Sequence, residues 1–247
     1  MKTQLFDLSS GYRRLNSFTL ATLIYLETIH FCERFLDHRN DPKGRLYDQM
    51  VQAARSGRAN IMEGSERSAT SKKNEILLTD VARASLVELM GDYEIWILRH
   101  DHSPWTTTCP EGIAAAKFWI DPQGEWKDTL HDFGNYIRAQ RKKMEPFTKI
   151  NDSVAVANFL LVLCKRTVAQ LNAQMKRQGE EFAERGGFHE RLTAVRVEAK
   201  RTAKEPVNED APQCPKCAQT MRLANGKHGQ FWSCLAYPTC SGTRQVS

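Results

Sequence analysis

The spacing of four cysteines near the C-terminus constrains this chain more than any other feature. Cys214 and Cys217 form one close pair, 16 residues follow, and Cys234 and Cys240 form a second pair with five residues between them. Each pair can place two thiolates on a tight turn, and four thiolates fill the tetrahedral shell that structural zinc prefers. We therefore predict one structural Zn2+ per chain, with redox-active or unrelated cysteines as the alternative.

The segment that carries these cysteines is too short to build a hydrophobic core of its own, so metal binding would supply its folding free energy. Residues 221–223 and 230–232 look like the two strands of a hairpin that turns at Asn225-Gly226. Residues 204–212 hold two prolines and three acids. We therefore expect a linker at 205–212 and a small β zinc ribbon at 213–247.

Three features of this segment resemble the C-terminal zinc ribbons of bacterial type I topoisomerases: Cys-Pro-Lys-Cys at 214–217, Gly229 followed by Phe231, and Tyr237-Pro238 between the last two cysteines. The resemblance implies binding of single-stranded DNA, with aromatic side chains stacked on bases and basic side chains on phosphates. An open alternative is that the aromatic side chains only cover the zinc site. The candidate contacts are Phe231, Trp232, Tyr237, Lys216, Arg222 and Lys227.

Apolar residues at steps of three and four predict four long helices before the linker. The first covers about 18–36, the second runs from Leu46 through Ile61 and ends at Gly64, the third starts after Thr70 or Ser71, and the fourth starts near Ser153. We expect a mainly α fold, in which residues 1–204 form an antiparallel up-down four-helix bundle. Residues 100–150 interrupt it as an ordered insertion with a short helix near 125–143, and a basic extra helix follows at about 189–203.

The segment from Gln52 to Ser65 resembles the signature of the four-helix-bundle family first noted as proteins encoded within intervening sequences of 23S ribosomal RNA genes. Residues 82–89 fit the family's third helix, and residues 186–192 resemble the "suffix" proteins of that family. The family includes the accessory variability determinant of diversity-generating retroelements. The resemblance implies a homo-oligomer, preferably a pentamer, that binds nucleic acid and a reverse transcriptase. The motif residues are Arg55, Ser56, Gly57, Asn60, Glu63, Gly64 and Arg83.

Two hypotheses account for the polar residues of this motif. They form either a binding surface or a hydrogen-bonded network in which Asn60, Glu63 and Arg83 tie the second helix to the third. We favour the network, because buried polar groups must be fully paired and would require these residue types without any ligand.

The chain carries 35 basic and 29 acidic residues, a net charge of +6 that permits a polyanionic partner without requiring one. Lys72 and Lys73 lie at the start of the third predicted helix. Cations at this end oppose the helix dipole, and a bound phosphate makes them more favourable. A cluster in the insertion comprises Arg138, Arg141, Lys142 and Lys143, and a solvated helix face is the alternative for each group. The candidate contacts outside the ribbon are Lys72 and Lys73 in the third helix, and Arg196, Lys200, Arg201 and Lys204 in the extra helix.

Signs of catalysis or membrane insertion are weak in this sequence. It has no phosphate-binding Walker loop, nothing that resembles a topoisomerase catalytic region, and no third ligand spaced to accompany His100 and His102. An export signal or membrane span is not indicated. We expect a cytoplasmic, non-enzymatic protein that binds single-stranded DNA or RNA. The alternative is a protein-binding scaffold that recruits an enzyme such as a reverse transcriptase.

Overall fold

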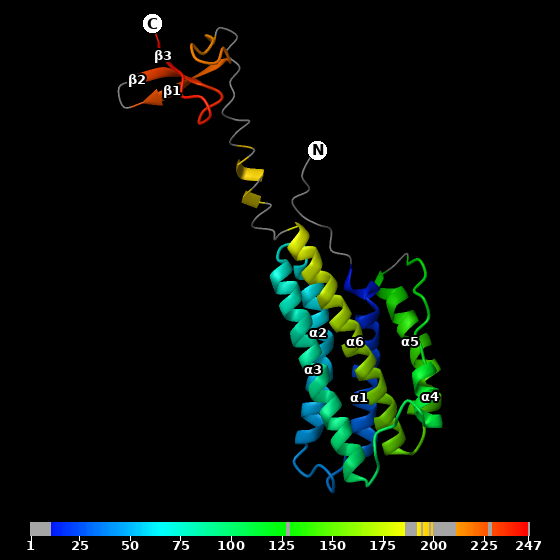
Figure 1. Ribbon diagram of the computed structural model, residues 1–247. Helices are drawn as coiled ribbons and strands as arrows, with labels where there is room; N and C mark the ends of the chain where they lie inside the picture. Colours follow the sequence, from blue (N-terminus) through cyan, green and yellow to red (C-terminus); the bar gives the residue numbers. More distant parts are fainter. Residues whose placement is uncertain are drawn as a thin grey trace. The chain divides into compact units, whose positions relative to one another are not determined.

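The computed structural model describes residues 11–126, 129–185, 192–193, 195–197, 199, 211–226 and 229–246. The chain divides into two compact units, Met1–Phe188 and His189–Ser247. We call them the helical unit and the ribbon unit, and each is described by itself. The predicted mainly α fold class with a small C-terminal sheet is confirmed (Figure 1).

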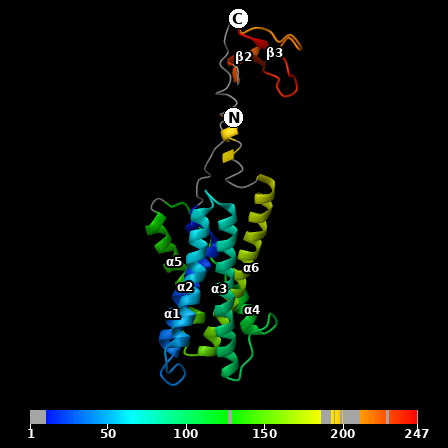
Figure 2. The same cartoon turned by 90° about the vertical axis from the view of Figure 1, so that its left-hand side faces the viewer.

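Four long helices dominate the helical unit. Helix α1 packs against α2 and α6, and α3 packs against the same two neighbours. Figures 1 and 2 show that successive members of this set run in alternating directions. Helices α4 and α5 lie against α6, and α5 also contacts α1. The elements are η1 (Tyr12–Arg14), α1 (Asn16–Phe35), α2 (Arg45–Arg67), α3 (Lys72–Arg99), α4 (Pro110–Lys117), α5 (Thr129–Thr148) and α6 (Ser153–Arg185).

The predicted end of the second helix at Gly64 is wrong, since α2 continues to Arg67. Gly64 is buried, and a Cβ there would lie 3.3 Å from the Glu75 carbonyl oxygen and from the Leu78 Cβ of α3. Close packing therefore explains this glycine, and it outweighs a helix-propensity cost of about 1 kcal/mol. The predicted start of the third helix is confirmed, because the Ser71 side chain accepts a hydrogen bond from the Asn74 amide at 3.2 Å.

The insertion at 100–150 is fastened to the long helices by arginines. Arg34 of α1 donates to the carbonyl oxygens of Thr148 and Ile150 at 2.5 and 2.6 Å, and Arg166 of α6 donates to that of Ala116 at 2.8 Å. In the insertion, α5 runs over Thr129–Thr148 rather than the predicted 125–143, and α4 is an additional helix. With eight residues, α4 is too short for its periodicity to stand out in the sequence.

Helix α6 is long and apolar enough to cross a membrane by length and composition. However, 56% of its most apolar window is buried within the protein. Phe159, Leu160 and Leu163 are fully covered, and the Phe159 ring stacks on Phe147 of α5 with centroids 4.4 Å apart. This burial is typical of a core helix.

The ribbon unit contains an antiparallel sheet in the order β1 (Met221–Gly226), β2 (Gly229–Cys234) and β3 (Thr243–Gln245). The predicted turn at Asn225-Gly226 is wrong, because these residues continue the ladder opposite Gln230 and Gly229. Residues 227–228, between the last pair of this ladder, lie outside the described residues. Of the predicted extra helix, the described residues 192–193, 195–197 and 199 are helical.

Candidate metal centre and nucleic-acid interface

The four clustered cysteines converge on one point in the ribbon unit. Their sulfur atoms all lie within 4.8 Å of one another, with Cys214 and Cys240 separated by 3.8 Å and Cys217 and Cys234 by 3.4 Å. Sulfurs bound at about 2.3 Å to a tetrahedral zinc ion are about 3.8 Å apart. The donor set and its spacing therefore fit one structural zinc ion. Within the described residues, no other group of His, Cys, Asp or Glu is arranged to hold a metal.

Two similar turns present the ligands. Cys214 opens a turn in which its sulfur accepts the Lys216 amide at 3.5 Å, and the sulfur of Cys234, at the end of β2, accepts the Ala236 amide at 3.4 Å. Amide hydrogen bonds to sulfur favour the thiolate that binds zinc and orient it.

The electrostatics of the cluster favour a cation at its centre. The Lys216 amide lowers the pKa of Cys214 to about 7. The Gln219 amide acts on Cys217 in the same direction, but the thiols of Cys234 and Cys214 together with burial outweigh it and raise the pKa of Cys217. Four thiolates therefore repel one another at this distance, and a divalent cation removes the repulsion.

Gly242 is a residue of the site that the sequence analysis missed. A Cβ at this position would overlap the sulfur of Cys214, and the Gly242 carbonyl accepts the Cys234 amide at 3.0 Å. The signal available in the sequence was a glycine two residues beyond the last cysteine. Only glycine allows the backbone to pass this close to the ligand.

The sheet register separates the predicted aromatic and basic contacts. Trp232 faces Leu223 on β1 and Arg244 on β3, whereas Phe231 faces Ala224 and Gln245 on the other side of the sheet. Arg244 is exposed and was not among the predicted contacts. The structure therefore pairs Trp232 with a cation that the sequence analysis did not single out.

The aromatic side chains differ in their exposure. Trp232 is half-buried and packs against the cluster formed by Cys214, Met221 and Cys234, so it covers the metal site at least in part. Tyr237 is 62% exposed and is the most accessible of the three predicted aromatic contacts. Lys216 is exposed and donates to the Ser241 hydroxyl at 3.1 Å, while Lys227 lies outside the described residues.

Comparison with known families supports this part of the chain alone. Residues 211–247 match the family model of the topoisomerase DNA binding C4 zinc finger. Comparisons with curated proteins and with solved structures give no match. The predicted topoisomerase-type ribbon is thus confirmed, with its one structural zinc ion, and its similarity to this family suggests nucleic-acid binding. The family match does not extend to the helical unit, whose predicted resemblance to the intervening-sequence family has no support from these comparisons.

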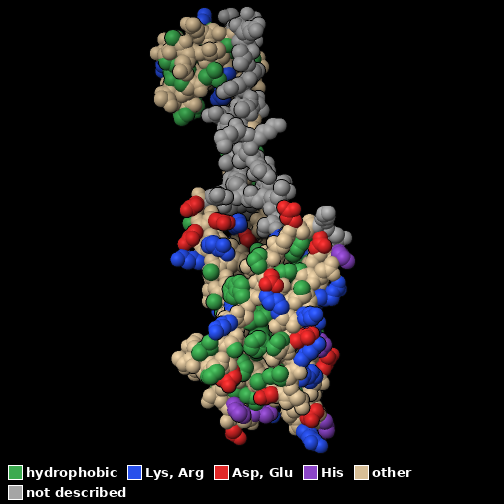
Figure 3. Space-filling view, turned by 90° about the vertical axis from the view of Figure 1, so that its right-hand side faces the viewer, with side chains coloured by type: hydrophobic (Ala, Val, Ile, Leu, Met, Phe, Trp, Pro, Cys, Tyr) green, Lys and Arg blue, Asp and Glu red, His purple; other side chains and the backbone are tan. Residues whose placement is uncertain are grey.

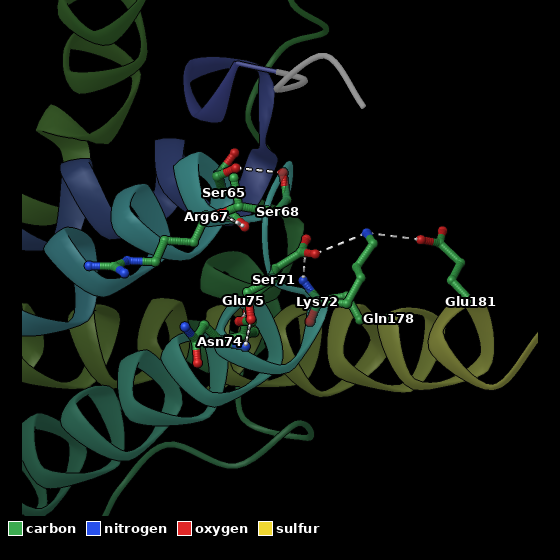
Figure 4. A network of polar contacts seen from close by, with 11 residues as sticks. Ser65, Arg67, Ser68, Ser71, Lys72, Asn74, Glu75, Gln178 and Glu181 are labelled. Atoms are coloured by element: carbon green, nitrogen blue, oxygen red, sulfur yellow. Dashed lines mark hydrogen bonds and ion pairs between the residues drawn. The ribbon is translucent and has the colours of Figure 1, made fainter. Parts of the chain in front are cut away.

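Lys72, a predicted phosphate contact, lies in a polar network at the start of α3 (Figure 4). Its ammonium group is 2.9 Å from a carboxylate oxygen of Glu75 and 3.2 Å from one of Glu181, and its side chain is 18% exposed. Burial lowers its pKa, but hydrogen bonds to both carboxylates outweigh burial and raise it. Gln178 of α6 donates to the second oxygen of Glu75 at 2.9 Å. Lys72 therefore has a structural role that balances a buried carboxylate.

The other predicted cations outside the zinc ribbon proper are more accessible. Lys73 is exposed beside Lys72, and Arg196 is exposed and helical. The predicted contacts Lys200, Arg201 and Lys204 lie outside the described residues.

A hydrogen-bonded network joins α2 to α3, as predicted, but it consists partly of other residues than those predicted. The Ser56 hydroxyl is 3.0 Å from that of Ser85 on α3, and Asn60 donates to the Ser56 hydroxyl at 3.1 Å. The predicted participation of Glu63 and Arg83 is wrong. Each pairs within its own helix, because a partner three or four residues away is nearer than the neighbouring helix. These pairs are Glu63 with Arg67 and Arg83 with Asp80.

The remaining motif residues are less involved in this link. Gly57 is buried, and a Cβ there would lie 2.9 Å from the Leu86 side chain of α3. Arg55 is exposed on the outer side of α2. Small residues at the contact therefore bring α2 and α3 close together.

Proposed function

We propose that this protein is a non-enzymatic nucleic-acid-binding protein whose zinc ribbon engages single strands. The observation that carries the proposal is the four-cysteine ribbon at 211–247, which is similar to a DNA-binding family and exposes Tyr237 and Arg244. Stacking on an aromatic side chain contributes about 1–3 kcal/mol per base and works with any base. Such a surface suits single-stranded DNA or RNA of any sequence.

Zinc, when bound, holds the two cysteine turns together, and four protein ligands leave it no open position for catalysis. The chain's own residues supply the contacts. Residues 212–244 hold four basic and no acidic side chains, and the zinc site with four thiolates contributes about −2. With a net charge of about +2 the ribbon can neutralise few phosphates, so its affinity alone is weak and salt-dependent. Cations outside residues 212–244, including Arg196, Lys200, Arg201 and Lys204, supply further phosphate contacts in this proposal.

The helical unit, in our proposal, is an up-down four-helix bundle of the intervening-sequence type that assembles into a homo-oligomer, with a pentamer preferred. The motif at α2 and α3 supports this interpretation. So does the outer side of α3, which exposes apolar side chains that a second copy would cover. They are Leu77, Val81, Val87, Ile95 and Leu98.

The second candidate is a scaffold that recruits a partner enzyme such as a reverse transcriptase. The same exposed apolar side of α3 favours it, because apolar patches of this kind commonly bind proteins.

A binding titration distinguishes the two candidates. The zinc-loaded full chain is titrated into labelled single-stranded and duplex DNA and RNA at several salt concentrations. The proposal predicts tighter binding to single strands and an affinity that falls as salt rises. Absence of binding to every probe at low salt would contradict it and favour the scaffold.

A further inference from the structure

A basic groove runs between α1 and α5 of the helical unit. It has a volume of about 820 Å3, and its lining includes Arg34, Arg138, Arg141, Lys142 and Lys149. These five cations face two acids in the lining, Glu27 and Glu145, which gives a net charge of +3 with His30 neutral. Figure 3 views the helical unit from the side that carries α5 and shows basic and acidic side chains together along its right-hand margin.

Two of the five cations build the walls of the groove. Arg34 donates to the carbonyl oxygens of Thr148 and Ile150, which joins α1 to the end of α5. Arg141 donates through Nε to Glu27 at 2.8 Å, and Glu27 is only 7% exposed. Arg141 therefore neutralises the buried acid, and its guanidinium retains four further N–H groups for other acceptors.

Arg138 and Lys142 are exposed and lie one helical turn apart on α5. Lys149 extends the row just beyond the helix, where it pairs with Glu145 at 2.7 Å. At about 1.5 Å per residue, the row covers about 16 Å along the helix axis. Lys143, which the sequence places in the same cluster, instead pairs with Asp121 at 2.7 Å.

The opposite charge gathers between α2 and α3. One groove there is lined by Asp48, Glu88 and Asp92 and by no lysine or arginine, and the adjoining groove has three acids against Arg45 and Arg99. Burial and the nearby Glu88 raise the pKa of Asp92. The basic lining is therefore particular to the α1–α5 groove and does not merely reflect the net charge of the chain.

We propose that the α1–α5 groove binds the phosphate backbone of a nucleic acid strand. The proposal rests on the proposed function and adds a second contact outside the ribbon. A row of cations with exposed ends suits a repeating polyanion better than a single small anion, which needs donors converging on one point. Because the contacts are made to phosphates, they carry no sequence preference.

The test compares two double variants of the zinc-loaded full chain. Arg138→Ala with Lys142→Ala removes two exposed cations from the groove. Lys176→Ala with Arg177→Ala removes two exposed cations from α6 and serves as the control with the same net charge. We expect the groove variant to bind single strands about tenfold or more weakly near 0.1 M salt. The slope of log affinity against log salt should flatten by about 1.4, which is about 0.7 for each lost phosphate contact.

The possible outcomes separate this proposal from the proposed function. If both double variants lose affinity equally while the wild type binds, the groove is not a site and the ribbon account stands. If the wild type binds no nucleic acid, both proposals fail. A groove variant that alone changes the oligomer size in light scattering would assign the groove to contacts between copies and overturn its role in nucleic-acid binding. Unchanged thermal unfolding of both variants shows that these differences do not come from misfolding.

Discussion

At the scale of single residues, the zinc site depends on Gly242 as much as on its ligands. We predict that Gly242→Ala weakens zinc binding by about tenfold or more, because the added Cβ must displace the sulfur of Cys214. Competition with a chromophoric zinc chelator measures the change. Gln245→Ala, an exposed position on β3, is the control and should behave as the wild type does. Equal zinc affinity of Gly242→Ala and wild type would show that the backbone can yield at this point.

The adjacent lysines at the start of α3 differ in their contribution to stability. Lys72→Ala leaves the carboxylate of Glu75 buried without its ammonium partner and should lower the free energy of unfolding by about 1–3 kcal/mol. Lys73→Ala removes an exposed cation and should change it by less than about 0.5 kcal/mol. Urea unfolding at pH 7 tests both, and equal losses would contradict the structural role of Lys72.

The ion pairs of Lys72 with Glu75 and Glu181 make the stability of the helical unit depend on pH. The pKa of Lys72 is raised from its ordinary value of 10.5 in the folded protein, since its two carboxylate partners outweigh burial. Its contribution to stability is therefore fully present below pH 10.5 and is lost as the pH rises through the raised value. The difference in the free energy of unfolding between wild type and Lys72→Ala should therefore shrink as the pH rises through the raised pKa of Lys72.

At the scale of elements, the sequence predicts long amphipathic helices well, because many apolar positions repeat at helical spacing. It gives α1, α3 and the start of α6 on that basis. It fails where one local signal competes with packing, as at Gly64, where contact with α3 keeps α2 helical. It also fails for elements with few residues: α4 has eight and β3 has three.

The candidate site, too, could be predicted from the sequence only where its features are local. The four ligands are predictable because cysteine spacing is a local property of the chain. The pairing of Trp232 with Arg244 and the convergence of Arg34 with α5 are not, because both depend on contacts between elements that are distant in sequence.

Removal of zinc should affect the two units differently. The helical unit has a large apolar core of its own, whereas the ribbon's buried cluster contains Cys214, Met221 and Cys234 and includes two of the metal ligands. We predict that a strong chelator unfolds the sheet and leaves the helices intact, because metal binding supplies most of the folding free energy of such modules. Amide hydrogen exchange measures protection in the two units separately. Retained protection of the β1 and β2 amides after zinc removal would contradict the prediction.

At the scale of the whole molecule, the exposed apolar side of α3 supports the proposed homo-oligomer. Ile95 and Leu98 are 56% and 54% exposed on the same helix. We predict that Ile95→Lys with Leu98→Lys dissociates the proposed homo-oligomer, because charged side chains cannot be buried unpaired in its interface. Multi-angle light scattering measures the mass. Ile113→Lys, on the exposed side of α4, is the control and should leave the assembly unchanged. A monomeric wild type at micromolar concentration would count against the proposed pentamer.

In the proposed function, the zinc ribbon binds single strands through the exposed ring of Tyr237. Fluorescence anisotropy with a labelled single-stranded oligonucleotide, measured for wild type, Tyr237→Ala and Tyr237→Phe with zinc content verified, tests it most directly. Loss of a stacking contact of about 1–3 kcal/mol predicts that Tyr237→Ala binds about 5- to 150-fold more weakly, with an unchanged salt slope. Tyr237→Phe, which keeps the ring, should restore the wild-type affinity. Unchanged single-strand affinity in Tyr237→Ala, or equal affinity of the wild type for single strands and duplex, would contradict the account.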